Sequence, residues 1–481
     1  MIELATVLAV PLITALVLAL FGHRRMAPEI NSIGSLLTLV AAGLLTVRVI
    51  DDGPMKLFNE QFFVDPLNVF LIALTALVGF TTSLFSRPYM RIEHDHGRLS
   101  IGRLRLYHSM FQMFMCTMLT ALSTNNLGIL WVAMEAATLT TVLLVALYRT
   151  PASLEAAWKY FILCGVGIAQ ALFGTILIYF AAERVLGQGG ALLWTHLDAV
   201  KAHLEPTVLS LAFVFLFVGY GTKTGLVPLH NWLADAHAEG PTPVSAVLSG
   251  LLLNVALYAI IRCKVLVDGA LETHFAGNMM MAFGLLTVVV PAFYLSRQKD
   301  VKRLFGYSSI EHMGLITFAF GMGGVASFAG LLHMTVHSLT KSAIFFAVGH
   351  AAQMAGTQII DDIRGLVKMS PTIGWGLMLG SLAILGMPPF GVFTSEFMIL
   401  TTAIKHYPWA TPILLTALGV AFASMFHKVQ GMVFGEPTVR PLAHNPALLP
   451  VFLHLGLVLM LGLWIPPYLA EWYRQAARLI G

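Results

Sequence analysis

Charged side chains are scarce in this chain. Only 11% of its 481 residues are Asp, Glu, Lys or Arg, whereas 57% are hydrophobic. A soluble domain carries roughly 25% charged residues, so this composition excludes an ordinary water-soluble protein. The formal net charge of +4 comes from basic residues spread over short polar connections, and it implies nothing about nucleic acid.

Cysteine is also rare, with three residues in all. Cys116, Cys164 and Cys263 lie in or beside apolar runs, and their spacing matches no metal-binding pattern. We expect them to behave as small core hydrophobes. The chain shows no nucleotide-binding loop, no cluster-binding cysteines and no soluble domain. Any energy that drives it is therefore expected to come from another subunit.

Long apolar runs dominate the chain. Each is about 18 to 25 residues or longer, enough to cross roughly 30 Å of hydrocarbon. The sequence therefore predicts an all-α polytopic membrane protein with about 14 transmembrane helices. The runs lie near residues 3–21, 31–49, 66–86, 107–123, 127–148, 158–182, 208–228, 243–262, 276–296, 303–322, 326–355, 371–388, 391–425 and 447–469. Run 326–355 is long enough for two pieces or one tilted helix, and run 391–425 includes a half-helix.

The distribution of Lys and Arg predicts the orientation in the membrane. Most of these residues fall in the loops that follow odd-numbered helices, and such loops face the cytoplasm. With fourteen spans, both termini would then face the periplasm of a bacterial cytoplasmic membrane. The residues that carry the bias are Arg24, Arg25, Arg87, Arg91, Arg98, Arg103, Arg105, Arg149, Lys159, Arg297, Lys299, Lys302, Arg303, Arg364, Lys368, Lys428 and Arg440.

Ionisable residues inside the apolar runs recur at nearly one offset, which suggests an internal repeat. The pairs, separated by 173 to 182 residues, are Glu135 and Glu311, Lys159 and Lys341, and Lys223 and Glu396. Five helices in each unit would make the two copies inverted, an arrangement typical of transporters. The pattern predicts N-terminal helices 1–3 over 1–100, repeats over 101–275 and 276–440, and a C-terminal helix over 441–481. Chance coincidence of spacing remains an alternative.

Lys223 is the most informative of these residues. It lies among Gly219, Gly221, Gly225 and Pro228, which predicts that the seventh helix is broken. A lysine at membrane depth costs about 2.5–3.5 kcal/mol and marks a functional site by default. Glu135, with no other charge near it in sequence, is its natural partner, so the two would form a coupled proton site. A static pair that locks two helices is the alternative.

A second group of ionisable residues follows one helix face. His333, His337 and Lys341 are spaced i, i+4 and i+8, which places them on one face about 6 Å apart along the axis. Histidine is the usual proton-carrying side chain near neutral pH, so the stripe predicts a proton relay. A zinc site on the two histidines and a purely structural core remain alternatives.

Glu396 follows Pro388-Pro389, where the sequence predicts that the twelfth helix is broken. It would end the relay, and a carboxylate that caps a half-helix N-terminus is a compatible alternative. Four more polar residues lie in the connection LHNWLADAHAEGPTP, where we expect a cytoplasmic entrance or a plain loop. They are His230, Asp235, His237 and Glu239.

Together these stretches resemble the antiporter-like, proton-pumping subunits of respiratory complex I, Mrp antiporters and membrane-bound hydrogenases. The stretches are GTKTGLVPLHNWLADAHAEGPTPVSA, QKDVKRLFGYSSIEHMG, HMTVHSLTKSAIFF and PPFGVFTSEFMIL. Within that superfamily, SLEAAWKYFILCGVGIAQALFGT, SSIEHMGLI and LSGLLLNVALYAIIR look most similar to component F of hydrogenase-4.

The resemblance implies a role for each residue. Glu135 and Lys223 would be the glutamate of the fifth helix and the lysine of the broken seventh helix, and Glu396 the exit residue of the twelfth. His333, His337 and Lys341 would form the central relay of the eleventh helix. Asn254 departs from the pattern, because complex I subunits often place lysine or histidine there. Water or Lys159 would then have to connect the two halves.

The leading functional hypothesis is a proton-translocating, non-redox subunit of an energy-converting complex such as a [NiFe] hydrogenase or formate hydrogenlyase. Such a subunit would need no cofactor or metal of its own, and its redox partners would carry nickel, iron and iron–sulphur clusters. Two alternatives remain, an Mrp-type Na⁺/H⁺ antiporter subunit and a proton-driven subunit for inorganic carbon uptake.

Overall fold

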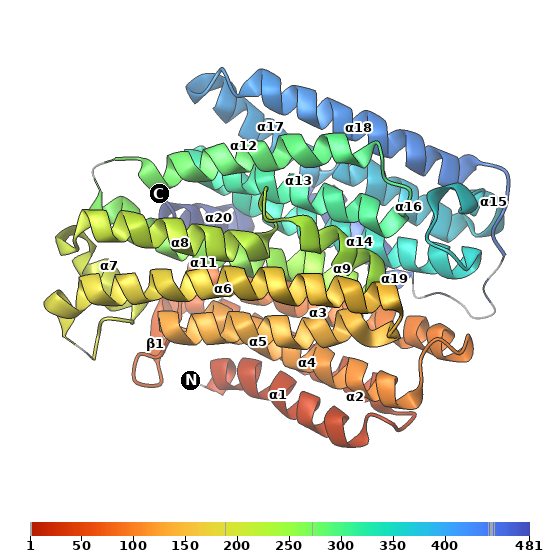
Figure 1. Cartoon of the computed structure of the whole chain (residues 1–481), viewed down its shortest axis with the longest axis horizontal. Coiled ribbons are helices and arrows are strands. Elements are labelled where there is room, and N and C mark those ends of the chain that lie inside the picture. The colour runs from red at the N-terminus through yellow and green to blue at the C-terminus, as the bar shows by residue number, and fades with distance from the viewer. Residues whose placement is uncertain (1, 188, 272, 441, 443–445, 447) are drawn as a thin grey trace.

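The computed structural model describes residues 2–187, 189–271, 273–440, 442, 446 and 448–481. Within this part of the chain the protein is a bundle of long helices that lie side by side, with both termini at the same end (Figure 1). One short hairpin, β1 (Met55–Leu57) and β2 (Phe62–Val64), is the only sheet among the described residues. The predicted all-α membrane architecture is confirmed.

The first three helices form one side of the bundle, drawn in red and orange in Figure 1. They are α1 (Ile2–Phe21), α2 (Ala27–Asp52) and α3 (Pro66–Asp95). Asp65 accepts hydrogen bonds from the amides of Leu67 and Asn68, and Asn68 accepts one back from the Asp65 amide. This reciprocal capping fixes where α3 begins after the hairpin.

The next segment contains five spans, and the fourth of them is interrupted. Its helices are α4 (Ile101–Ser123), α5 (Leu127–Val145), η1 (Ala146–Tyr148), α6 (Pro151–Leu186), α7 (Trp194–Val200), η2 (Lys201–His203), α8 (Pro206–Thr224), α9 (Asn231–Glu239), α10 (Thr242–Val247), η3 (Leu248–Leu252) and α11 (Leu253–Ala270). The break between α8 and α9 confirms the predicted interruption of the seventh span. A π-helical turn, η3, joins α10 to α11.

The following five spans repeat this plan, again with the fourth interrupted. They are built from α12 (Phe275–Leu295), α13 (Val301–Met322), α14 (Val325–Ala355), η4 (Ile360–Asp362), α15 (Leu366–Met369), α16 (Pro371–Ile384), α17 (Gly391–His406) and α18 (Thr411–Phe434). The break between α16 and α17 confirms the second predicted interruption. Run 326–355 is one continuous helix. Run 391–425 contains the half-helix α17 and the first part of α18, as predicted, with residues 407–410 between them.

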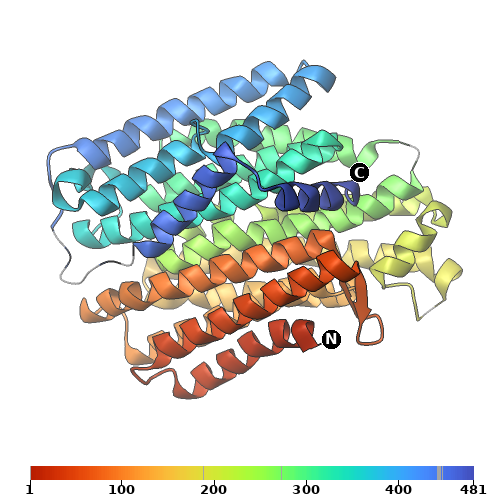
Figure 2. The same ribbon diagram turned by 180° about the vertical axis from the view of Figure 1, so that it is seen from behind.

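The chain closes with α19 (Leu449–Leu463) and α20 (Pro467–Arg478), which are bent by 82° at their junction. Both lie on the face seen in Figure 2. The predicted boundaries at 100 and 440 fall between helices, whereas the one at 275 falls on the first residue of α12.

Among the described residues, ten helices are long and apolar enough to cross a membrane, or eleven if the bent pair counts as one span. The other three expected spans are helices too. In α4 and α13, polar residues lower the mean hydropathy, and the interrupted α16–α17 consists of two short pieces.

Two spans occupy the centre of the bundle. In the span from Thr242 to Ala270 and in α14, every residue of the most apolar stretch is buried inside the protein. In α18, only 28% of the residues in the corresponding stretch are buried. A membrane helix that is buried on all sides does not contact lipid, so it is free to carry polar side chains. The ionisable residues of α14 lie in this central position.

Candidate functional site

Lys223 lies in the last turn of α8 and is completely buried. The helix ends there because Gly225 adopts a left-handed conformation with φ of +82°, which glycine accepts most readily. The Lys223 ammonium donates to the Met134 carbonyl at 3.2 Å and to the Thr138 hydroxyl. It also lies 5.8 Å from the centre of the Tyr160 ring. Every one of these partners is uncharged.

Glu135 is connected to Lys223 indirectly, through the side chain of Thr138. The Thr138 hydroxyl lies 3.3 Å from Glu135 Oε2, so one side chain bridges the ammonium and the carboxylate. Glu135 is half-buried and interacts electrostatically with Lys223. The structure therefore brings the two predicted partners together, with Thr138 between them. Sequence reasoning missed Thr138, because a threonine within an apolar helix gives no signal by itself.

His333, His337 and Lys341 are all completely buried on α14. The two imidazole rings are stacked with their centres 6.4 Å apart, as their placement on one helix face predicts. The Lys341 ammonium donates to the Phe305 carbonyl at 3.1 Å. Both ring nitrogens of His337 lack a hydrogen-bond partner within the described part of the protein. Water is the partner that such buried polar atoms usually find.

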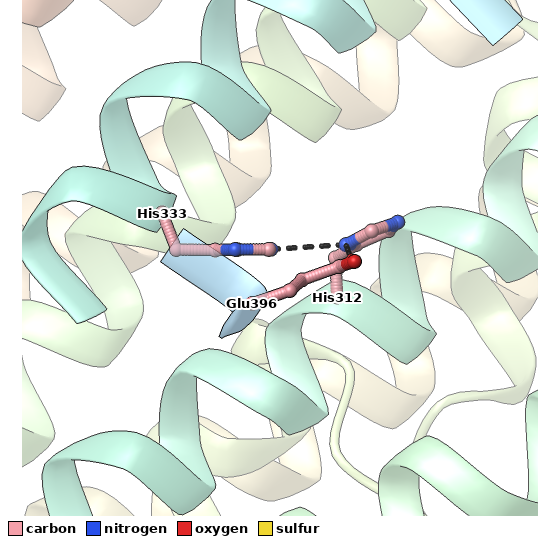
Figure 3. A group of neighbouring side chains, drawn as sticks. All are labelled: His312, His333 and Glu396. Carbon is pink, nitrogen blue, oxygen red and sulfur yellow. Dashed lines mark hydrogen bonds and ion pairs between the residues drawn. The ribbon is translucent and has the colours of Figure 1, made fainter. Parts of the chain in front are cut away.

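His312, on α13, joins this group and was missed by the sequence analysis. Its Nδ1 lies 2.9 Å from His333 Nε2 and 3.9 Å from Glu396 Oε1 (Figure 3). On its other side, His333 Nδ1 lies 2.9 Å from the Ser395 hydroxyl. The available signal was its position beside Glu311, since a second titratable group in an apolar helix is rare.

Glu396 lies next to the second break. It completes a buried row of side chains that also contains His312, His333, His337 and Lys341. Its carboxylate packs against Gly386, so closely that a Cβ atom at that position would fall 2.0 Å from Glu396 Oε2. The alternative of a helix cap does not fit, because Glu396 lies beyond the first turn of α17. Glu311 is buried on α13 and interacts electrostatically with both Lys341 and Glu396.

Asn254 lies on α11, a helix that packs against α8, which carries Lys223. Its amide donates to Ser338 Oγ at 2.8 Å and to the Gly250 carbonyl at 3.1 Å. Ser338 follows His337 on α14, so Asn254 contacts the helix that carries His333, His337 and Lys341. The Asn254 Oδ1 atom is buried and has no partner among the described residues.

The residues near the first break differ from the loop that the sequence predicted. Asp235, His237 and Glu239 belong to α9, and His230 immediately precedes it. His237 is completely buried and stacks on Phe345 of α14, with ring centres 5.0 Å apart. His230 is mostly buried. The expectation of a plain loop was wrong, because this segment is the second half of an interrupted span.

Lys159 does not belong to the buried row. Its side chain is 49% exposed and pairs with Glu155 at 2.6 Å and Asp235 at 3.2 Å. Asp235 also pairs with Arg303. The idea that Lys159 connects the two halves is not supported by this position, because its charge is already satisfied in a surface cluster.

The comparisons with known proteins agree with this architecture. Residues 124–422 match the family model described as "NADH:quinone oxidoreductase/Mrp antiporter, TM". The chain belongs to this family, and it is a multi-pass, antiporter-like membrane subunit.

Among its relatives, the chain is 48% identical to the hydrogenase-4 component F homolog of Methylacidiphilum infernorum over 99% of each protein. In a structure of the membrane-bound sulfane sulfur reductase, an archaeal respiratory membrane complex, one chain matches with a TM-score of 0.89. The identity is 25%, over 99% of this chain and 97% of the other. A chain of the Mrp complex from Dietzia sp. shares the fold, with a TM-score of 0.86 and 20% identity over 100% and 98% of the two chains. These findings confirm the resemblance that the motifs indicated.

Proposed function

We propose that this chain translocates protons as the non-redox subunit of an energy-converting membrane complex of the hydrogenase-4 or formate-hydrogenlyase type. The observation that carries the proposal concerns Lys223 and Lys341. Each is completely buried, and each donates only to uncharged oxygens within the described residues. An unpaired ammonium is costly at membrane depth, which suits a group that must release a proton and regain it.

The surrounding polar side chains would supply the rest of the path. Glu135 is connected to Lys223 through Thr138, and Glu396 is close to the histidines next to Lys341. Between the two groups, Asn254 cannot titrate, but its unpartnered Oδ1 suits a water molecule. Water beside Asn254, instead of Lys159, would then connect the two halves. His230, His237 and Glu311 would line the path or its entrance.

We also propose that residues 101–275 and 276–440 form two inverted units, each contributing one half of the path. An odd number of spans in the first unit reverses the direction of the second. The supporting observation is that each segment contains five spans of which the fourth is interrupted. Residues 1–100 and 441–481 would flank these units.

The proposed location is a bacterial cytoplasmic membrane, with both termini in the periplasm. The excess of Lys and Arg in the loops at the opposite end supports this orientation. In this setting redox partners would carry the [NiFe] centre and the iron–sulphur clusters. Their chemistry would shift the charge states of the coupled residues.

The test is purification of the native complex, followed by proton uptake into inverted membrane vesicles. We expect the chain to co-purify with nickel- and iron-containing subunits, and uptake to require hydrogen or formate turnover. Sustained Na⁺/H⁺ exchange by the chain alone in liposomes would contradict the proposal and favour the Mrp-type function, which the shared fold with the Mrp complex makes the second candidate. Co-purification with a soluble non-redox partner would favour coupling to inorganic carbon uptake.

A further inference from the structure

The cluster of His312, His333 and Glu396 has a geometry that proton transfer alone does not require. His312 Nδ1 and His333 Nε2 face each other at 2.9 Å, and Glu396 Oε1 lies 3.9 Å from the same His312 nitrogen. One ligand atom from each of the three residues lies within 4.8 Å of the other two (Figure 3). All three side chains are buried.

The neighbours of the two histidines orient their lone pairs. Ser395 Oγ lies 2.9 Å from the Val392 carbonyl and 3.2 Å from the Gly391 carbonyl, so its own proton is used there. We therefore assign Ser395 as the acceptor of a hydrogen bond from His333 Nδ1–H. His333 Nε2, which faces His312, therefore carries a lone pair when the ring is neutral.

The second ring is held in a similar way. His312 also interacts electrostatically with the backbone of Ile384, and we assign this interaction to Nε2 because Nδ1 faces His333. With Nε2 donating to Ile384, the neutral His312 ring also presents a lone pair to its partner. In this assignment two lone pairs face each other at 2.9 Å, and either a proton or a metal ion between them would stabilise the contact. Outer partners of this kind are what metal-binding histidines normally have.

A fourth ligand, which would be the third nitrogen, lies nearby. The His337 ring centre lies 5.6 Å from that of His312, and both of its nitrogens are buried without a partner within the described residues. This observation is independent of the His312–His333 contact. It indicates a pocket that favours nitrogen ligation, in contrast to the all-oxygen surroundings of Mg²⁺ and Ca²⁺.

We propose that His312, His333 and Glu396 bind one divalent transition-metal ion such as Zn²⁺, and that the bound ion blocks proton transfer reversibly. Zinc binds histidine nitrogens at about 2.0–2.1 Å in tetrahedral geometry, which separates two such nitrogens by about 3.3 Å. The rings need to part by only a few tenths of an ångström to admit the ion, and a small movement of Glu396 closes the third side. The metal would take the place of the proton between the histidines. The claim that the ion blocks proton transfer rests on the proposed function, whereas the claim that the ion binds does not.

Metal binding is tested directly on the purified full-length chain. Titration with Co²⁺, followed by visible absorption, should give one tetrahedral site per chain, and added Zn²⁺ should displace the Co²⁺. We expect His312→Gln and His333→Gln to weaken binding at least tenfold and Glu396→Gln to weaken it by less. His454→Gln is the matched control, because His454 is equally buried but bonds to Thr81 and the Leu339 carbonyl instead. Size-exclusion chromatography identifies any variant that fails to fold. If a histidine variant fails to fold, the test of the site uses Glu396→Gln in its place.

Either of two results would overturn the site: no stoichiometric Co²⁺ or Zn²⁺ in the wild-type chain, or equal binding by the folded cluster variants and the wild type. Inhibition is tested on the complex in inverted vesicles, where Zn²⁺ but not Mg²⁺ should slow proton uptake in both the wild type and His454→Gln. Stoichiometric zinc binding with unchanged uptake would refute only the claim that the ion blocks proton transfer. Absence of uptake without any added metal would instead refute the proposed function.

Discussion

Lys223 and Glu135 are joined through a single hydroxyl group. The ammonium at the end of α8 and the carboxylate on α5 both contact Thr138 Oγ1, one turn beyond Glu135 on the same helix. The hydroxyl can turn its proton toward the carboxylate while its lone pairs accept from the ammonium. We therefore expect it to transmit a change of charge on one residue to the other without a direct ion pair.

Removing this bridge should weaken the coupling without removing either charge. We expect Thr138→Val, which keeps the shape of the side chain, to reduce proton uptake into inverted vesicles several-fold. Thr140→Val is the control and should retain normal uptake, because Thr140 bonds only to carbonyls of its own helix. Equal uptake by both variants would show that the bridge has no role in transfer.

Removal of either charge should have a larger effect. We expect Lys223→Met to abolish uptake while the protein still assembles, because the central titratable group is gone. Glu135→Gln should reproduce much of this loss, since a coupled pair needs both members. The measurement is uptake at matched expression, with hydrogen or formate turnover recorded in parallel. Normal uptake by both variants would contradict the assignment of this pair.

The histidine row should matter less than its lysine. We expect His333→Ala or His337→Ala alone to lower uptake partly, because water can replace one ring in a chain of hydrogen bonds. Lys341→Ala should lower it severely, since the charge that interacts with Glu311 is lost. Uptake that is normal in all three variants would indicate a purely structural core.

Lys159 provides a contrast. It is half-exposed and pairs with Glu155 and Asp235, and surface pairs of this kind contribute about 0–1 kcal/mol. We expect Lys159→Ala to retain proton uptake within about twofold and to assemble normally. A loss as deep as that of Lys341→Ala would place Lys159 in the path after all.

Stability should depend strongly on a buried ion pair outside this row. Arg262 Nη2 lies 2.8 Å from Asp65 Oδ1, both side chains are at most 4% exposed, and Asp65 also caps α3. Removing one member leaves a buried charge without its partner, which costs about 3–5 kcal/mol. We expect Arg262→Met to lower the Tm of the purified chain clearly. Lys56→Ala, which opens an exposed pair with Glu60, should leave it nearly unchanged.

Much of the fold could be predicted because it follows from local composition. An apolar run long enough to cross the membrane must satisfy its backbone internally, so it becomes a helix. For that reason most of the fourteen runs coincide with helices, and both breaks lie where glycine and proline interrupt the pattern. The prediction failed for α9, because the polar character of residues 230–239 suggested a loop, whereas burial against α13 and α14 satisfies a short helix there.

The sequence by itself determined the class of protein, the two interrupted spans and the common face of His333, His337 and Lys341, because each depends on composition or on helical periodicity. Only the tertiary structure decided which side chains meet. His312 approaches His333 from another helix, Thr138 comes between Lys223 and Glu135, and Lys159 turns to the surface. Contacts between helices depend on how each one is rotated and offset along its axis. That arrangement is set by the packing of the whole bundle and by no local stretch of the chain.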